Sequence, residues 1–297
     1  MPDFSLTERA RRLPIWRGEV AIKPLSGGTT NYNFLVENQG QRYVVRVGDD
    51  IPIHQIMRFN ERAASLAAFH AGISPEVIHS ESGILVMRYI DGRTCTPADI
   101  RDGATLGKIL PLLKRVHREI PRYIRGPVLA FWVFHVIRDY AHTLEEAGSK
   151  YASRLPDLLE VAATLELAIG PVDLVFGHND LLSANFIDDG ARIWLIDWDY
   201  AGFNSPLFDL ANLASNSEFD VPQEEWMLAV YFGRPPDTAL WRSYRAMKCA
   251  SLLREAMWSM VSEIHSKLDF DYGAYTLDYM DRFARIHAAF QKADLPG

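Results

Sequence analysis

The sequence is poor in cysteine, which bears on the kinds of site the protein can hold and on its cellular compartment. Only two cysteines occur in 297 residues, Cys95 and Cys249, and they lie far apart. Neither belongs to a C-x-x-C pair or to a cysteine–histidine cluster with zinc-ligand spacing. This argues against a disulfide framework and a zinc site, and it favours a reducing compartment.

Long hydrophobic runs and an excess of positive charge are also missing. The longest apolar stretch, residues 128–134, is too short to span a bilayer, and residues 1–20 lack the apolar core of a signal peptide. With 31 basic and 38 acidic residues the formal charge is −7, which argues against a nucleic-acid partner. We therefore expect a cytoplasmic protein with no stable membrane insertion and no nucleic-acid partner.

The first third of the chain carries β-strand patterns and one amphipathic helix. Strands are predicted at 20–25, 31–37 and 42–47, and the turn Asn38–Gln41 joins the last two as an antiparallel hairpin. Apolar residues recur every three or four positions over 53–71 and Gly72 follows, which predicts a helix. Two short strands are predicted at 76–79 and 84–90.

Helical patterns dominate after Asp91 and Gly92, and the length suggests about two domains or lobes. Short strands interrupt the helices at 174–176, 185–187 and 193–196. We predict an α+β protein with an N-terminal lobe at 1–90 and a catalytic and substrate-binding lobe at 91–297. The predicted helices cover 96–118, 128–147, 154–169, 206–214, 223–232, 238–266 and 270–291.

The most specific segment spans residues 175–202. It holds the pattern His178-x-Asp180-x-x-x-x-Asn185, followed by an apolar strand that ends at Asp197. Phosphoryl transfer from ATP needs a carboxylate near the acceptor hydroxyl and oxygen ligands for Mg²⁺. Asp180 is the candidate base, and Asn185 and Asp197 are the candidate ligands. The simpler alternative is that these residues serve as turn and cap residues.

This segment resembles the signature shared by aminoglycoside phosphotransferases and choline/ethanolamine kinases, two families that resemble protein kinases in fold. The resemblance extends to residues 25–33, Leu-Ser-Gly-Gly-Thr-Thr-Asn-Tyr-Asn, and to Ala256-Met257-Trp258 and Asp269-Phe270-Asp271-Tyr272-x-x-Tyr275. It implies a bilobal protein-kinase-like fold with a small antiparallel β-rich N-terminal lobe and a larger, mainly helical C-terminal lobe. It also implies an enzyme that uses ATP and Mg²⁺ to phosphorylate the hydroxyl of choline or a related amino alcohol.

The resemblance assigns a nucleotide site to the N-terminal lobe. Arg46 would hold the α- and β-phosphates with Glu61 as its partner, and backbone groups of Arg88 and Ile90 would hold the adenine. Arg46 and Glu61 could instead be surface residues. Paired glycines lie between two strands, where backbone N–H groups could approach phosphate oxygens, although an ordinary hairpin turn is the simpler interpretation. This phosphate-covering loop comprises Ser26, Gly27, Gly28, Thr29, Thr30 and Asn31.

The resemblance also assigns an aromatic cage for a cationic alcohol. Cation–π attraction is the available force for a quaternary ammonium, which donates no hydrogen bond. The matching positions are Tyr200, Trp258, Tyr272 and Tyr275, each of which could equally pack in the core.

Three positions depart from the pattern of eukaryotic choline kinases. Glu255 replaces a tryptophan, Leu182 a glutamine and Asn216 a glutamate. Glu255 lies three residues before Trp258 on one helix face, where it could hydrogen-bond an amine N–H.

Several alternatives remain open from the sequence. An aminoglycoside or thiamine phosphotransferase is the second hypothesis, and a non-catalytic kinase-like binder is the third. The complete set of candidate catalytic and nucleotide-binding residues favours an enzyme. The oligomeric state, including a homodimer, is not determined.

Overall fold

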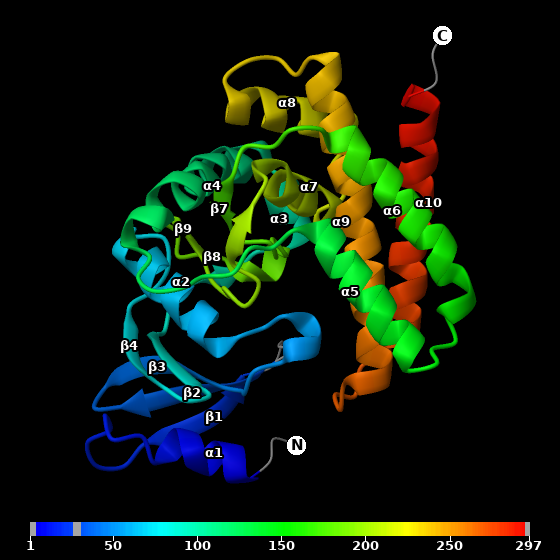
Figure 1. Cartoon of the computed structure of the whole chain (residues 1–297). Helices are drawn as coiled ribbons and strands as arrows, with labels where there is room; N and C mark the ends of the chain where they lie inside the picture. The colour runs from blue at the N-terminus through cyan, green and yellow to red at the C-terminus, as the bar shows by residue number, and fades with distance from the viewer. Residues whose placement is uncertain (1–3, 26–30, 295–297) are drawn as a thin grey trace.

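Five antiparallel strands form the N-terminal sheet in the computed structural model, which describes residues 4–25 and 31–294 (Figure 1). At the predicted hairpin, Gln39 and Gly40 have φ angles of 50° and 74°. A two-residue turn with positive φ at both positions matches the twist of the flanking strands and favours glycine. The strand order is β1 (Ala21–Leu25), β2 (Tyr32–Asn38), β3 (Gln41–Val47), β5 (Ile84–Arg88) and β4 (Val77–Glu81).

A short helix that the sequence did not predict, α1 (Phe4–Arg11), covers part of this sheet. Ala10 and Leu13 pack with Phe34 and Val45 in a small apolar cluster of this lobe. Buried residues alternate along β2 and end β3 in an unbroken run of three, and with the residues of this cluster they give the sheet a core of its own.

The predicted helix at 53–71 begins later than expected. A single 3₁₀ turn, η1 (Pro52–His54), comes first, and Gln55 then adopts a left-handed conformation with φ of 59°. Helix α2 (Arg58–His70) begins where the Asp50 carboxylate accepts a hydrogen bond from the Arg58 N–H at 2.7 Å. Apolar residues keep the helical spacing across η1 and Gln55, so the sequence pattern did not show where the helix is interrupted.

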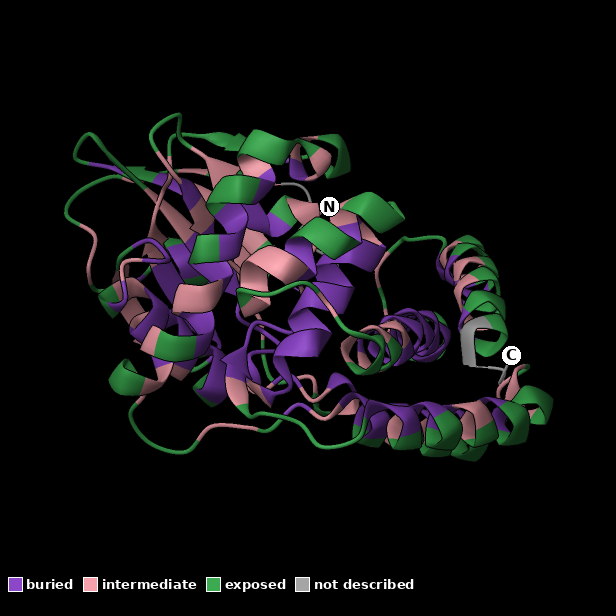
Figure 2. Cartoon of the chain, turned by 90° about the horizontal axis from the view of Figure 1, so that it is seen from above, coloured by how far each residue is buried: buried purple, intermediate pink, exposed green. Residues whose placement is uncertain are grey.

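The C-terminal lobe is built around α9, which packs on α5, α6, α7 and α10. Outer helices in Figure 2 bury one face and expose the other. The helices are α3 (Pro97–Arg101), α4 (Gly103–Tyr123), α5 (Val133–Glu146), η2 (Ala152–Arg154), α6 (Leu155–Ile169), α7 (Pro206–Asn216), α8 (Val221–Phe232), α9 (Thr238–His265) and α10 (Tyr272–Asp294).

The helix predicted at 96–118 is two helices. Thr96 and Asp99 form a capping box at the start of α3, as a Thr three residues before an acidic residue favours. Asp102 then leaves the helical conformation, and its carboxylate accepts a hydrogen bond from the Thr105 N–H at 2.9 Å. Asp102 therefore ends α3 and caps α4.

Short strands in the C-terminal lobe carry the signature segment. β7 (Val175–Gly177) pairs with β10 (Gly202–Asn204), and β8 (Phe186–Asp188) lies between β6 (Arg93–Thr94) and β9 (Ile193–Leu195). The sequence predicted β7, β8 and β9 but not β6 and β10. The turn η3 (Ser183–Asn185) leads into β8.

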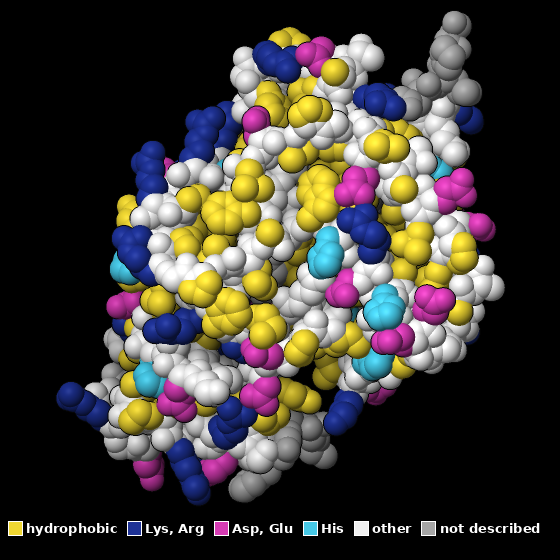
Figure 3. Space-filling model, viewed as in Figure 1, with side chains coloured by type: hydrophobic (Ala, Val, Ile, Leu, Met, Phe, Trp, Pro, Cys, Tyr) yellow, Lys and Arg dark blue, Asp and Glu magenta, His cyan; other side chains and the backbone are white. Residues whose placement is uncertain are grey.

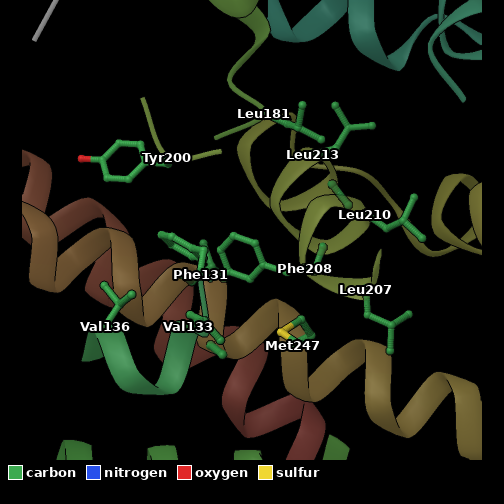
Figure 4. Close-up of a cluster of buried hydrophobic side chains, with 14 of the residues drawn as sticks. Phe131, Val133, Val136, Leu181, Tyr200, Leu207, Phe208, Leu210, Leu213 and Met247 are labelled. Atoms are coloured by element: carbon green, nitrogen blue, oxygen red, sulfur yellow. The ribbon is translucent and has the colours of Figure 1, made fainter. Parts of the chain in front are cut away.

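A large apolar core fills the C-terminal lobe and extends beneath α2. Figure 4 shows Phe131, Phe208 and Met247 in this core, brought together from different elements. Lys, Arg, Asp and Glu side chains are interspersed over the face drawn in Figure 3. Among the described residues, no helix is both long enough and apolar enough to cross a membrane.

Candidate active site

The loop after β7 holds Asp180, and a carboxylate from α7 fixes its backbone. Asp209 accepts hydrogen bonds from the N–H groups of His178 at 2.9 Å and Asn179 at 2.8 Å. Asn179 has a φ of 65°, a left-handed conformation that costs free energy unless its surroundings hold it. His117 Nε2 lies 2.9 Å from Asp209. Sequence reasoning missed Asp209, which has no motif of its own and lies inside an amphipathic helix.

Asp180 is half-buried in surroundings that disfavour its charged form. Burial raises the pKa of Asp180 well above its ordinary value, and the Glu255 carboxylate raises it further. The nearby Arg254 guanidinium lowers the same pKa and so opposes both effects. A buried carboxylate among charges of both signs is the environment of an acid–base group.

Asn185 and Asp197 follow Asp180 in the chain, and both line a cavity between the lobes. The Asn185 side-chain amide donates to the Asp180 carbonyl at 2.8 Å, which orients it. Asp197 lies two residues after the end of β9, following Ile196, with a φ of 69°, and 27% of its side chain is exposed. One carboxylate and one amide oxygen fit a Mg²⁺ ion that takes its other ligands from phosphates and water.

The predicted pair of Arg46 and Glu61 is formed. Arg46 Nη1 lies 2.6 Å from Glu61, 3.0 Å from Asp197 and 2.8 Å from Asp199. Burial alone would lower the pKa of Arg46, but these three carboxylates raise it well above its ordinary value. The two residues are buried, so the alternative of a surface strand residue and a solvated helix residue is wrong for this pair.

Two charged residues that the sequence analysis missed complete this network. Arg58, at the start of α2, lies 2.7 Å from Glu61 and 2.9 Å from Asp199. Its Nη2 donates to the Asn31 amide oxygen at 2.7 Å, and the Asn31 amide nitrogen donates to Asp199 at 2.8 Å. The end of the predicted phosphate-covering loop is thus tied to the segment after β9. The only available sequence signal was the second carboxylate in Asp197-Trp198-Asp199.

A cavity of about 330 Å³ lies between the lobes next to these charges. It brings together Asn31, Arg46, Arg88, Ile90, Asn185 and Asp197 from the predicted set. The Arg88 N–H already donates to the Glu76 carbonyl at 2.8 Å, so an adenine contact at Arg88 would use the carbonyl. The predicted loop positions 26–30 lie outside the described residues.

Three of the four predicted cage aromatics cluster where the C-terminal half of α9 meets the start of α10. The Trp258 ring centroid lies 6.0 Å from those of Tyr272 and Tyr275. The Tyr275 hydroxyl donates to Glu255 Oε1 at 2.9 Å. Glu255 and the three aromatics therefore form one group of contacting residues.

The fourth aromatic, Tyr200, has a cationic neighbour that the sequence analysis missed. The Arg254 guanidinium lies 4.3 Å from the Tyr200 ring centroid and 2.7 Å from Glu255 Oε2. Asn216, another departure from the choline-kinase pattern, contacts Leu181 and the Tyr279 hydroxyl.

Known proteins are similar to this chain in both sequence and fold. Residues 21–247 match the model of a family described as the phosphotransferase enzyme family. The protein LicA of Haemophilus influenzae is 26% identical over 263 residues, which cover 86% of this chain and 76% of LicA.

Two crystal structures are similar in fold over most of their length. A choline/ethanolamine kinase family protein from Mesorhizobium loti has a TM-score of 0.75 and 27% identity, with 97% of each chain covered. The choline kinase LicA from Streptococcus pneumoniae has a TM-score of 0.76 and 27% identity, with 91% of this chain and 94% of that chain covered. The α+β kinase-like fold predicted from the sequence is confirmed, and this chain belongs to the phosphotransferase enzyme family, in which alcohol groups accept the phosphoryl group.

Proposed function

We propose that this protein transfers the γ-phosphoryl group of ATP to the hydroxyl of choline or a related small amino alcohol. The observation that carries the proposal is the interlobe cavity lined by Arg46, Asn185 and Asp197. Asn185 donates a hydrogen bond to the Asp180 carbonyl, and Glu255, which raises the pKa of Asp180, belongs to the aromatic group. The similar proteins include choline and ethanolamine kinases, which supports the same substrate class.

Each residue has a proposed part that follows from its position. Arg46, held by three carboxylates, offers one guanidinium to the α- and β-phosphates. Asp180 orients the acceptor hydroxyl and takes its proton as the oxygen attacks the γ-phosphorus. Glu255, Trp258 and Tyr275 attract the positive nitrogen of the acceptor by charge and by ring faces.

Asn185 and Asp197 are the proposed Mg²⁺ ligands. Among the described residues, no cluster of three or more His, Cys, Asp or Glu side chains could hold a metal alone. That agrees with an ion bound mainly through the nucleotide, because Mg²⁺ commonly takes only one or two protein carboxylates plus phosphates. When bound, the ion neutralises charge that develops on the phosphates.

The test is an assay of ATP consumption by the purified chain with choline, ethanolamine, thiamine and several aminoglycosides as acceptors. Mass spectrometry of the product identifies which acceptor gains a phosphoryl group. The proposal requires turnover with at least one small amino alcohol that exceeds the acceptor-free rate. Turnover with aminoglycosides or thiamine alone would assign the second hypothesis instead, and no turnover with any acceptor would favour a non-catalytic binder.

A further inference from the structure

A buried arginine lies inside the group of residues proposed to hold the acceptor. Arg254 on α9 is 1% exposed, and its Nη1 donates to Glu255 Oε2 at 2.7 Å. Its guanidinium carbon lies 4.3 Å from the Tyr200 ring centroid and 5.5 Å from that of Phe131. Both distances are within the range of cation–π attraction.

Tyr200 therefore already has a cation on its ring. Figure 4 shows its hydroxyl pointing away from the apolar cluster of Phe131 and Phe208. A ligand cation placed at the same ring would be close to the Arg254 charge, and the repulsion between like charges is strong in a site from which water is excluded. Ring faces alone thus offer a quaternary ammonium less attraction here than a cage without an internal cation would.

Glu255 keeps capacity for an N–H donor. Its Oε1 accepts from the Tyr275 hydroxyl at 2.9 Å, and its Oε2 accepts from Arg254. An ionised carboxylate has about four acceptor positions, so these two bonds do not saturate it. An ammonium with N–H groups can use the remaining positions, whereas a trimethylammonium cannot donate to them.

The charges and the unsatisfied donors near Asp180 also fit a small, singly charged alcohol. Asp180, Glu255 and Arg254 together leave one net negative charge when both carboxylates are ionised. Buried donor atoms of Arg254 (Nε and Nη2), Tyr200 (hydroxyl) and Trp258 (Nε1) have no hydrogen-bond partner among the described residues. Buried polar atoms are normally satisfied, so these donors are available to an acceptor atom such as a ligand hydroxyl oxygen.

We propose that Arg254 is a specificity-determining residue that makes the acceptor site select amino alcohols whose nitrogen carries N–H groups over those with a quaternary nitrogen. The inference rests on the proposed function and narrows its substrate class. Arg254 takes one of the rings that a methylated ammonium would use, and it holds Glu255 beside the aromatic group.

The test is the kcat/KM of the full chain for a series that differs only in nitrogen methylation: ethanolamine, N-methylethanolamine, N,N-dimethylethanolamine and choline. We expect the wild-type value for ethanolamine to exceed that for choline by at least about tenfold, the ratio that corresponds to about 1.4 kcal/mol. In Arg254→Met the ring of Tyr200 is freed, and we expect the ratio to fall by at least about tenfold, mainly through a lower KM for choline.

A matched control comes from the same helix. Lys248 forms another buried ion pair, with Glu224 of α8, and has no part in the proposed site. Lys248→Met removes a buried cation from α9 without touching Tyr200 or Glu255, so it should leave the ethanolamine-to-choline ratio unchanged. An equal change of the ratio in both variants would mean that the helix, not the guanidinium, is responsible, and would overturn the inference.

The wild-type series can overturn the role of Arg254 even if Arg254→Met fails to fold. Choline used as well as or better than ethanolamine overturns the role of Arg254 and leaves the proposed function standing. If no member of the series is phosphorylated, both the role of Arg254 and the proposed function are overturned. A steep wild-type preference for ethanolamine that Arg254→Lys retains supports the inference, because lysine keeps the positive charge.

Discussion

At the scale of single residues, Asp180 is the group on which the proposed chemistry depends most directly. We expect Asp180→Asn to lower kcat by at least about 10²-fold, the lower range for loss of a general base. The affinity for nucleotide should change little, because Asp180 is not among the residues that line the interlobe cavity. Steady-state kinetics together with nucleotide titration measure both quantities.

Asp173, an exposed residue in the loop before β7, provides the control for Asp180. Asp173→Asn makes the same chemical change 7 positions earlier in the chain and should leave kcat as it is. Near-normal turnover in Asp180→Asn would contradict the role of Asp180.

For Asp197 we expect an effect on nucleotide binding, because it is the only carboxylate of the two proposed metal ligands. Asp197→Ala should weaken binding of a non-hydrolysable ATP analogue at least about tenfold when Mg²⁺ is present, since a hard cation loses an anionic oxygen ligand. Isothermal titration calorimetry measures the change. With the metal chelated, wild type and variant should bind the analogue with similar affinity. A large difference under chelation would mean that Asp197 acts through its contact with Arg46 instead.

At the scale of elements, the short turn η1 connects the N-terminal lobe to two helices of the other lobe. His54 Nδ1 lies 3.2 Å from the Tyr140 hydroxyl of α5, and Nε2 lies 3.1 Å from the Ser262 hydroxyl of α9. Burial, together with the positive charges of Arg254 and His265, lowers the pKa of His54 to about 3. This histidine is therefore neutral in the folded protein over the whole physiological pH range.

The lowered pKa predicts how stability depends on pH. Below an unfolded-state pKa of about 6.5 the unfolded chain binds a proton at His54 that the folded chain refuses, so the free energy of unfolding falls as the pH drops from about 6.5 toward 3. The contribution of one such group approaches about 1.4 kcal/mol per pH unit. His54→Gln should flatten the slope by an amount of this order. Urea unfolding at several pH values measures it.

Burial lowers the pKa of His178 too, so His178 adds to the same pH dependence of the free energy of unfolding. The slope of His54→Gln is therefore compared with the slopes of wild type and of a control variant, not with zero slope. His135 on the outer face of α5 is exposed, and His135→Gln should keep the wild-type slope. An unchanged slope in His54→Gln would show that His54 can be protonated in the folded state.

At the scale of the whole molecule, the two lobes share hydrogen bonds as well as the cavity. The Asn60 amide of α2 donates to the Ala201 carbonyl at 2.7 Å and accepts from the Leu129 N–H at 2.9 Å. Ser74 donates to the Leu195 carbonyl. These bonds couple the sheet lobe to the signature segment, so the lobes should unfold together.

Nucleotide binding should stabilise both lobes at once. A ligand that binds only the folded state, at a concentration about 100 times its Kd, raises the free energy of unfolding by about 2.7 kcal/mol. We therefore expect the Tm to rise by about 5 °C with the non-hydrolysable analogue and Mg²⁺. Differential scanning calorimetry should show one transition that moves as a whole. Inorganic phosphate at the same concentration is the control. A second transition that the nucleotide leaves in place would contradict coupling of the lobes.

Much of the fold and of the nucleotide side of the site could be predicted because local patterns carry it. The hairpin at Asn38–Gln41 follows from turn chemistry, and α9 and α10 follow from hydrophobic periodicity. The signature from His178 to Asp197 is contiguous, so the pattern itself named Asp180, Asn185 and Asp197, of which Asn185 and Asp197 line the cavity and Asn185 donates a hydrogen bond to the Asp180 carbonyl. The interruption at Asp102 and the delayed start of α2 were missed, since a cap or a left-handed residue interrupts a helix without interrupting its apolar period.

Tertiary structure decided what no local pattern contains. The sequence by itself determined the family signature, the lobe order and the identity of Asp180, Asn185 and Asp197 as candidates, because these depend on residues close together in the chain. That Arg58 shares two carboxylates with Arg46, and that Arg254 lies on the ring of Tyr200, depend on contacts between positions far apart in sequence. A charged residue in a helix is ordinarily solvated, and only packing shows which one is buried against a partner.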